Sequence, residues 1–552
     1  MTNQKKNEHI FAGIDQLSLR SLIIGAMGSA VITASSMYIA LRLSALPWPI
    51  IFVSVLSMAL LKALGKTTLN EINITQTSMS AGSMVAGGLA FTLPGLWMSG
   101  IWEGEGLISE HLWKVIAVAL AGTILGTVLT WFLRPKFVER DNLPYPIGMA
   151  AAETISAGDK GGKKSVVLFG TMAFSALFTY LRDNLKVIPS LIQSQWLISR
   201  NFFVSVWVSP MAGAIGYLIG SLYTMVWFIG AVLSYVIIIP FGPALGVFES
   251  VDAATSFAQT AGIGLMVGTG LGVVISFVVA FIKKQIGSKS ETKASLGKSD
   301  KPKSNKTTLL TVIAIGISFV LSVVCGLGPV ASILLIIGVF IVSAMAATLT
   351  GETGINPMEI FAIIVLLGIR LLVNLDAASA FFAAACVAVA CGYAGDLLND
   401  YKAGHVIGTN PVAQLISQVV GGIIGSVVAA IVMFAVIGRF GGVGPGTELS
   451  AGQAYAVSQM VNGIGNPLVF AIAAIAGVLL YLLKVPAMTL GIGMYLPFYI
   501  SSAVVIGGVV RFILDRIRPQ SQNTGNVAAS GIFGGEGIAG VTDAIIKMII
   551  GG

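Results

Sequence analysis

Residues 411–437 read PVAQLISQVVGGIIGSVVAAIVMFAVI, without a single Asp, Glu, Lys, Arg or His. A helix needs about 17–25 residues to cross the roughly 30 Å hydrocarbon core of a bilayer, so this stretch predicts a transmembrane helix. We interpret other apolar stretches in the same way, although some are too short or too interrupted by glycine for a simple crossing. They are residues 17–41, 47–64, 78–98, 112–133, 165–181, 202–222, 224–247, 258–282, 308–327, 329–349, 358–374, 377–395, 467–483, 486–510 and 530–550.

The composition agrees with a chain that lies largely in lipid. Hydrophobic residues make up 55% of the 552 residues and charged residues 10%, and the mean hydropathy is +0.90. A soluble globular protein carries roughly 25% charged residues, so several water-soluble domains are excluded. The 66 glycines suit helices that pack closely in a membrane. We therefore predict an all-α polytopic membrane protein with about 14–16 transmembrane or re-entrant helices.

Lysine is concentrated in one segment between the apolar stretches. Residues 283–306 contain eight lysines against one glutamate and one aspartate, which is +6 of the formal net charge of +8. Because Lys and Arg accumulate in cytoplasmic loops, we expect a cytoplasmic linker here, and Lys5 and Lys6 place the N-terminus on the same side. The basic charge therefore does not indicate a nucleic-acid partner. The expected location is the inner (plasma) membrane, with multiple crossings of the lipid bilayer.

The linker divides the chain into an N-terminal transmembrane half, residues 1–282, and a C-terminal transmembrane half, residues 307–552. Two short sequence similarities across it favour two related halves, as in transporters with internal repeats. Residues 70–76, NEINITQ, resemble residues 351–357, GETGINP, and PYPIGM at 144–149 resembles Pro486 followed by GIGM at 491–494. Counting every later stretch as a span would place Arg511, Arg516 and Arg518 outside, so we expect at least one later segment to be re-entrant or broken.

Polar or Gly/Pro-broken backbone at membrane depth occurs only where it lines protein or a cavity. The first such segment is Asn70–Gly88, NEINITQTSMSAGSMVAGG, in which Asn73, Thr75 and Gln76 offer donors and acceptors at the start of a helix. Helix N-termini favour an anionic substrate group. The alternative is an N-capped helix with a small-residue packing face.

The second segment, Leu143–Gly158, begins LPYPIG and carries Glu153 on a short apolar helix. An isolated carboxylate at membrane depth is costly unless it is paired or protonated, and burial favours its protonated form. Glu153 is thus a candidate for carrying a coupling proton. The alternative is an interfacial glutamate held by Lys160 or Lys163.

The third segment, Gly351–Glu359, reads GETGINPME, in which glycine and proline break the backbone while Glu352, Asn356 and Glu359 supply oxygens. Freed backbone and half-helix ends form substrate and ion sites in broken-helix transporters. The alternative is an exposed loop with Glu359 in the first turn of a helix.

A fourth segment, Val485–Tyr499, is VPAMTLGIGMYLPFY, and GIFGGEGIAG follows at Gly531–Gly540. Both combine glycine breaks with a few polar groups, and the alternative for Glu536 is a helix cap near the membrane interface. Two ion pairs are expected, Arg182 with Asp183 and Arg370 with Asp376. Residues 395–405, GDLLNDYKAGH, combine Asp, Lys and His, and we interpret them as a cytoplasmic connection.

Several classes of function are disfavoured. Three cysteines and three histidines argue against a disulfide framework, a haem or a multi-histidine metal site, so we expect no cofactor and no bound metal. No GxxxxGK[ST] loop indicates ATP drive, and no filter-like motif indicates a channel. A nucleophile with an adjacent base is also lacking, so the protein is not expected to be an enzyme.

These same segments resemble the oligopeptide transporter (OPT) superfamily, in particular bacterial members related to the yellow-stripe-like metal-chelate carriers. The resemblance rests on NITQTSMSAGSMVAGGLAFTLP at Asn73–Pro94, LPYPIGMAAAE at Leu143–Glu153, TGINPM at Thr353–Met358, GDLLNDYKAGHVIGTNP at Gly395–Pro411 and ASGIFGGEG at Ala529–Gly537.

The resemblance implies a secondary active transporter that takes up short oligopeptides or glutathione-like peptide derivatives with protons. Alternatives are an importer of metal–chelate complexes and a sodium-coupled carrier. The outer loop lacks a histidine-rich or strongly acidic character, which favours a peptide over a chelate. The candidate substrate-binding residues are Asn73, Thr75, Gln76, Tyr145, Asn356 and Tyr495, and the candidate proton-coupling residues are Glu153 and Glu352. A homodimer is compatible with the sequence, which does not determine the oligomeric state.

Overall fold

The computed structural model describes residues 10–11, 13–44, 50–103, 107–158, 163–287, 305–353, 356–462 and 466–550. These residues are almost entirely helical. The exceptions are two small antiparallel pairs, β1 (Ile10–Phe11) with β2 (Ile14–Asp15) and β3 (Leu191–Gln193) with β4 (Ser205–Trp207). The predicted all-α fold class is therefore confirmed.

In the part of the chain that the structure describes, ten helices or helix pairs are long and apolar enough to cross a membrane. They are Leu19–Arg42, Leu69–Met98, Leu107–Arg140, Val166–Asn184, Ser221–Ala244, Leu309–Leu327, Pro329–Gly351, Ala377–Ile407, Pro411–Arg439 and Phe498–Ile517. Exposed apolar side chains such as Leu310, Ile337 and Ile423 cover the outside of these helices, as expected for a surface in contact with lipid. The chain is a multi-pass membrane protein.

A first group of helices is centred on three that pack against each other, α3 (Leu69–Ala90), α16 (Ala377–Ile407) and α17 (Pro411–Arg439). All residues of α3 from Glu71 to Ala90 are buried. The close approach of α17 to α3 requires a residue without a side chain at Gly421, because a Cβ atom there would overlap the Ser78 carbonyl group.

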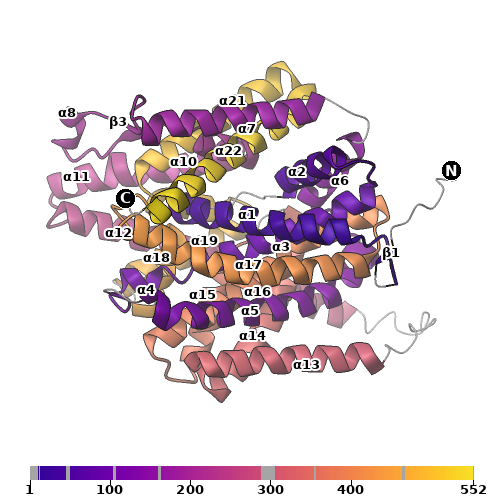
Figure 1. Ribbon diagram of the computed structural model, residues 1–552. Coiled ribbons are helices and arrows are strands. Elements are labelled where there is room, and N and C mark those ends of the chain that lie inside the picture. Colours follow the sequence, from indigo (N-terminus) through magenta and orange to yellow (C-terminus); the bar gives the residue numbers. More distant parts are fainter. Residues whose placement is uncertain are drawn as a thin grey trace.

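Other helices of the first group surround these three (Figure 1). They are α1 (Leu19–Leu43), α2 (Ile50–Ala63), α4 (Gly95–Met98), α5 (Leu107–Arg134) with the π-helical turn η1 (Pro135–Arg140), α6 (Pro146–Gly158), α13 (Asn305–Ser322) with η4 (Val323–Leu327), α14 (Pro329–Thr353), α15 (Met358–Arg370) and α18 (Gly452–Asn462).

A second group packs beside the first. It contains α7 (Lys163–Thr179) with η2 (Tyr180–Asn184), α8 (Gln195–Ile198), α9 (Pro210–Ile219), α10 (Ser221–Val232) with η3 (Leu233–Ile238), α11 (Ile239–Ala244), α12 (Val251–Gly287), α19 (Pro467–Leu482), α20 (Ala487–Tyr495), α21 (Phe498–Ile517), η5 (Pro519–Ser521) and α22 (Gln522–Ile550). In both groups, helices from before and after the lysine-rich linker contact each other, for example α3 with α17 and α9 with α21.

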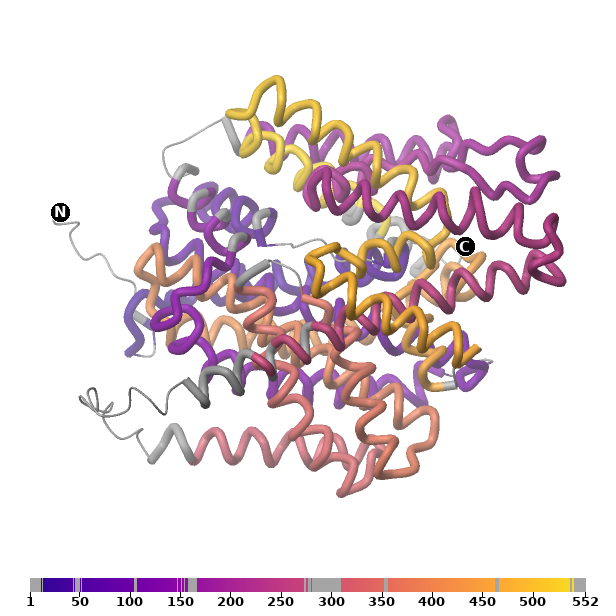
Figure 2. The backbone as a smooth tube through the Cα atoms, turned by 180° about the vertical axis from the view of Figure 1, so that it is seen from behind, coloured from indigo at the N-terminus to yellow at the C-terminus, as the bar shows by residue number. Residues whose placement is uncertain are grey.

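The bundle has two ends (Figures 1 and 2). At one end, here called the N-terminal face, α1 begins beside the start of α17, where Asn410 hydrogen-bonds Gln16 and Asp15. At the opposite face lie α8, β3 and α11. Three chain breaks lie between these faces, between α9 and α10, between α14 and α15, and between α19 and α20.

One of these breaks explains why a simple count of spans places Arg511, Arg516 and Arg518 on the wrong side. At 1.5 Å per residue, the 10-residue α9 and the 9-residue α20 are each about 15 Å long or less, too short to cross a bilayer. Each therefore ends within the bundle. The predicted break among the later segments is observed at Leu483–Pro486, between α19 and α20.

One predicted boundary is wrong. Residues 395–405 were expected to form a cytoplasmic connection after a span ending at 395, but α16 continues without interruption to Ile407. Asp400 and Lys402 are buried among neighbouring helices because α3, α6 and α17 pack around this end.

Candidate functional site

A cavity of about 540 Å³ lies where the three chain breaks meet. Ile219 and Leu222 flank the first break, at Gly220 between α9 and α10. Asn356 and Pro357 belong to the second, between α14 and α15, and residues 482–486 form the third, between α19 and α20. The volume lies within the range of roughly 300–1,000 Å³ that is typical of small-molecule sites. We call it the central cavity.

Two carboxylates and an amide from the first helix group line the central cavity. Asn356 donates through Nδ2 to Oδ2 of Asp396 and to the carbonyl oxygen of Cys391, at 2.9 Å each. Glu359, on the first turn of α15, lines the same cavity and lies close enough to Asp396 for the two charges to repel each other. Within the described residues neither carboxylate forms an ion pair, so both are available to a cation in the cavity.

The rest of the wall is mostly apolar and aromatic, with one cation at its exposed side. Met84 of α3, Phe91 and Trp227 of α10 contribute to the wall. Lys484 lies in the exposed turn between α19 and α20 and is the one basic residue among the described lining residues. The cavity thus places negative groups deep in the bundle and a positive group at its open side.

A buried polar network adjoins the cavity one helical turn further along α16. Asp400 is fully buried, and its Oδ1 accepts hydrogen bonds from Gln76 Nε2 at 3.3 Å and Ser80 Oγ at 3.4 Å. Its Oδ2 has no hydrogen-bond partner among the described residues. Gln76 also donates to Asn73 Oδ1 at 3.2 Å. The network therefore consists of amides and hydroxyls around one carboxylate, without a counter-charge in the described part of the chain.

Three of the predicted substrate-binding residues lie on α3, and the structure brings two of them together. Asn73 and Gln76 belong to the Asp400 network, and Asn73 also donates to Thr409 Oγ1 at 3.3 Å. The Thr75 hydroxyl donates to the Glu71 carbonyl oxygen of its own helix at 2.9 Å. None of the three lines the central cavity, whereas Met84 of the same segment does.

The other candidates are more dispersed. Asn356 lines the central cavity. Tyr145 is buried away from it, where its amide group donates to the Gly351 carbonyl oxygen at 2.8 Å and its hydroxyl to the Ala347 carbonyl oxygen at 2.9 Å. Tyr495 is buried behind the wall, with its ring stacked on Tyr455 at a centroid distance of 5.6 Å.

The two predicted proton-coupling residues are placed only through their backbones. Glu153 belongs to α6 and Glu352 to the last turn of α14. Their side chains lie outside the described side chains, so their role stays a prediction.

Sequence reasoning missed Asp396 and Asp400 as site residues. Both stand in GDLLNDYKAGH, where neighbouring Lys402 and His405 suggested contact with water. The available signal was their spacing of four residues, which places both on one side of a helix if the apolar helix from Ala377 continues.

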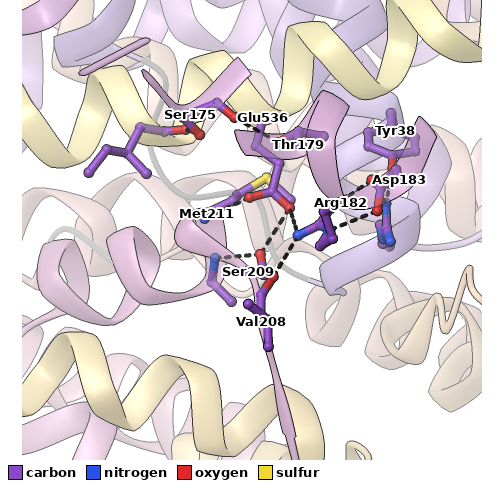
Figure 3. A network of polar contacts seen from close by, with 12 residues as sticks. Tyr38, Ser175, Thr179, Arg182, Asp183, Val208, Ser209, Met211 and Glu536 are labelled. Atoms are coloured by element: carbon purple, nitrogen blue, oxygen red, sulfur yellow. Dashed lines mark hydrogen bonds and ion pairs between the residues drawn. The ribbon is translucent and has the colours of Figure 1, made fainter. Parts of the chain in front are cut away.

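A second polar cluster joins α7, α9 and α22 near the opposite face (Figure 3). Arg182 bonds Asp183 through two nitrogens at 2.7 Å each, which confirms this predicted pair, and it donates to Glu536 Oε1 at 2.8 Å. Glu536 also accepts from the Ser209 hydroxyl at 3.0 Å and the Met211 amide at 2.9 Å. Glu536 is fully buried within α22 and, through the Met211 amide, helps to cap the first turn of α9.

The other predicted pair, Arg370 with Asp376, is wrong, because Arg370 donates to the carbonyl oxygens of Met460 and Val461 and Asp376 accepts from the Ser379 amide.

Among the residues that the structure describes, no group of three or more His, Cys, Asp or Glu side chains is arranged to hold a metal ion.

Comparison with known proteins points to transport. A family model described as "OPT oligopeptide transporter protein" matches residues 16–547. A curated protein of Haemophilus influenzae (strain ATCC 51907 / DSM 11121 / KW20 / Rd), named "Putative oligopeptide transporter", is 26% identical over 597 aligned residues, which cover 92% of each chain.

Proposed function

The chain belongs to the OPT oligopeptide transporter family, and we propose that it is a proton-coupled carrier that takes up short peptides or glutathione-like peptide derivatives by alternating access. The observation that carries the proposal is the central cavity, in which Asp396, Glu359 and Asn356 meet at three breaks in membrane helices. Broken helices at mid-bundle are the usual setting of substrate sites in secondary transporters.

The charges of the cavity suit a peptide. Asp396 and Glu359 offer two carboxylates to the α-ammonium group of a peptide, and a carboxylate receives such a group through charge-assisted hydrogen bonds. Lys484 provides the opposite charge at the exposed side, and the apolar and aromatic wall between them suits side chains of varied kind. A zwitterion of a few residues matches this distribution better than a simple metal ion.

Proton coupling is supported by carboxylates that have no positive partner in the described part of the chain. A carboxylate at membrane depth is costly unless it is paired or protonated, and such residues commonly mark proton relays. Asp400 lies in this situation beside the cavity, and Glu153 and Glu352 are the candidates from the sequence. If one of these carboxylates is protonated when the peptide binds, the movement of the proton across the membrane is coupled to that of the peptide.

Alternating access is supported by the division into two helix groups with the cavity between them. The first group supplies Asp396 and Glu359, and the second supplies the breaks at Gly220 and at Leu483–Pro486. A movement of the second group against the first would open the site to one face and then to the other. We place the N-terminal face and residues 283–306 in the cytoplasm of a cell whose inner membrane holds the protein, on the basis of the lysine distribution.

Uptake into proteoliposomes tests the proposal. Purified protein is reconstituted, an inward proton gradient is imposed, and accumulation of a radiolabelled tripeptide is measured before and after a protonophore collapses that gradient. We expect accumulation above equilibrium that the protonophore abolishes and that Asp396→Asn strongly reduces. Asp252→Asn, a change of an exposed carboxylate in the first turn of α12, is the matched control and should leave uptake unchanged.

Other outcomes would redirect the proposal. Accumulation that depends on a sodium gradient alone would show a sodium-coupled carrier, and accumulation of a metal–chelate complex without any peptide uptake would show the chelate alternative. Normal tripeptide uptake by Asp396→Asn would remove the central cavity as the peptide site.

A further inference from the structure

A second cavity, of about 1390 Å³, is lined in part by exposed residues that follow η2, near the opposite face. It is bounded by the ends of α1 and α17, by residues 182–191 after α7, and by parts of β4, α21 and α22. No residue lines both this second cavity and the central cavity. The two are separate chambers.

The charge of the second cavity is opposite to that of the central one. Arg42, Arg182, Lys186 and Arg439 line it against Asp183 and Glu448. Glu536 pairs with Arg182 from behind the wall. Even when its negative charge is included, the positive charges around the cavity outnumber the negative ones. Such a lining attracts an anionic group.

Arg182 is already satisfied, and Arg42 is not. The Arg182 guanidinium bonds Asp183, Glu536 and the Val208 carbonyl oxygen (Figure 3). The Arg42 side chain, 9% exposed, lies 3.5 Å from Asp183 Oδ2, and the described residues offer it one further polar partner, the Tyr38 hydroxyl. Because a guanidinium carries five donors, Arg42 retains donors for a ligand.

The position of Arg42 is fixed by its surroundings. Its guanidinium carbon lies 5.3 Å from the centre of the Trp207 ring, and the Arg182 pair holds Asp183 in place beside it. Arg439, at the end of α17, is exposed on the same cavity. A buried, oriented arginine together with an exposed one is suited to bind a carboxylate.

The wall between the chambers includes the backbone of the same arginine. The Ser450 hydroxyl donates to the Arg42 carbonyl oxygen at 3.0 Å, and the Ala451 amide donates to the Leu41 carbonyl oxygen at 2.8 Å. Glu448 on one side of this junction lines the second cavity, and Ser44 and Gln453 on the other side line the central one. The segment from Glu448 to Gln453, together with the end of α1, thus separates the central cavity from the second cavity.

We propose that the second cavity is a separate binding site, which receives a carboxylate group of the peptide through Arg42 and Arg439 before the peptide reaches the central cavity. The inference rests on the proposed function, because it presupposes a peptide substrate. It adds a site at which the transporter selects peptides by their carboxylate.

The test compares uptake of a tripeptide that ends in a free carboxylate with uptake of its C-terminal amide, in cells that express each variant. For the wild type we expect a lower KM for the free acid. Arg439→Gln should raise the KM of the acid about threefold, as for an exposed ion pair, and Arg42→Lys about tenfold, as for a charge-assisted hydrogen bond. Neither should change the KM of the amide. Arg200→Gln removes an exposed arginine of the same face that does not line the cavity. It controls for the general electrostatic attraction of anionic peptides to this face and should leave both KM values unchanged.

A third peptide identifies the source of the carboxylate. This peptide is the C-terminal amide with a glutamate residue in its sequence. If it has a low KM that Arg439→Gln raises, the site binds any carboxylate of the peptide. If Arg439→Gln and Arg42→Lys changed the KM of acid and amide alike, or changed neither, the second site would be refuted while peptide transport stood. If the wild type took up no peptide at all, the proposed function would fail and this inference with it.

Discussion

At the scale of single residues, the contrast between Asp396 and Asp400 is the most informative feature of the site. They lie one turn apart on α16, yet Asp396 lines the central cavity beside Asn356, whereas Asp400 is enclosed by Gln76 and Ser80. One side chain can contact a substrate and the other cannot. Under the proposed function, we therefore infer that Asp396 binds the substrate and that Asp400 carries the proton.

The assignment predicts different losses for the two residues. Asp400→Asn preserves shape and can keep the hydrogen bond from Ser80, but it cannot lose or gain a proton. We expect this variant to exchange peptide across proteoliposomes at a rate close to that of the wild type, and to lose accumulation driven by a proton gradient. Counterflow and gradient-driven uptake of the same labelled tripeptide measure the two activities.

Equal loss of exchange and accumulation would assign Asp400 to folding or binding instead. Retained accumulation would show that another carboxylate carries the proton, and Glu153→Gln and Glu352→Gln would be the next variants to measure.

The sequence predicted some of these residues and not others, for a physical reason. The break at Gly351–Glu359 could be predicted, because glycine and proline interrupt a helix locally whatever surrounds them. The burial of Asp400 could not, since it depends on an amide and a hydroxyl of α3 that lie more than 300 positions away in the chain. The same holds for Glu536, whose partner Arg182 is supplied by η2.

At the scale of helices, close contact depends on a few glycines. A Cβ atom at Gly421 of α17 would overlap the Ser78 backbone of α3, whereas at Gly438 of the same helix it would meet nothing within 4 Å. The two positions form a matched pair. They separate the packing requirement from the general effect of glycine on a helix.

We predict that Gly421→Ala destabilises the protein by about 1–3 kcal/mol, as overpacking does in well-packed cores. Gly438→Ala should be neutral, or stabilising by about 0.5–1 kcal/mol, because alanine favours the helix over glycine. Thermal unfolding of the two variants and the wild type in the same detergent measures the difference. A lower apparent melting temperature for Gly438→Ala than for Gly421→Ala would refute the close α3–α17 contact.

At the scale of the whole molecule, the breaks determine which loops share a face. Because α20 is too short to cross, α19 and α20 together add no crossing, and α21 ends at Ile517 on the N-terminal face, where α7 begins. Counting every apolar stretch as a span had instead placed Arg511, Arg516 and Arg518 outside. The number of spans could not be obtained from the sequence, because a hydrophobic stretch looks alike whether its helix crosses the bilayer or turns back. The division into two related halves stays a prediction.

Sidedness gives a direct prediction. The native cysteines Cys325, Cys386 and Cys391 are buried, so single exposed cysteines can be introduced against a low background. A membrane-impermeant maleimide should label Lys186→Cys in intact cells and Arg518→Cys only after permeabilisation. The reverse pattern would place the N-terminal face outside the cell.

The binding of a tripeptide to the purified protein tests most directly whether the central cavity is the peptide site. A ligand that binds only the folded state stabilises it by about 2.7 kcal/mol at a hundredfold excess over Kd, so a shift in thermal unfolding reports affinity. We predict a clear shift for the wild type and for Asp252→Asn, and an affinity about tenfold to a hundredfold lower for Asp396→Asn, the loss of a charge-assisted hydrogen bond. An Asp396→Asn variant that binds the tripeptide as tightly as the wild type would contradict the assignment of the central cavity.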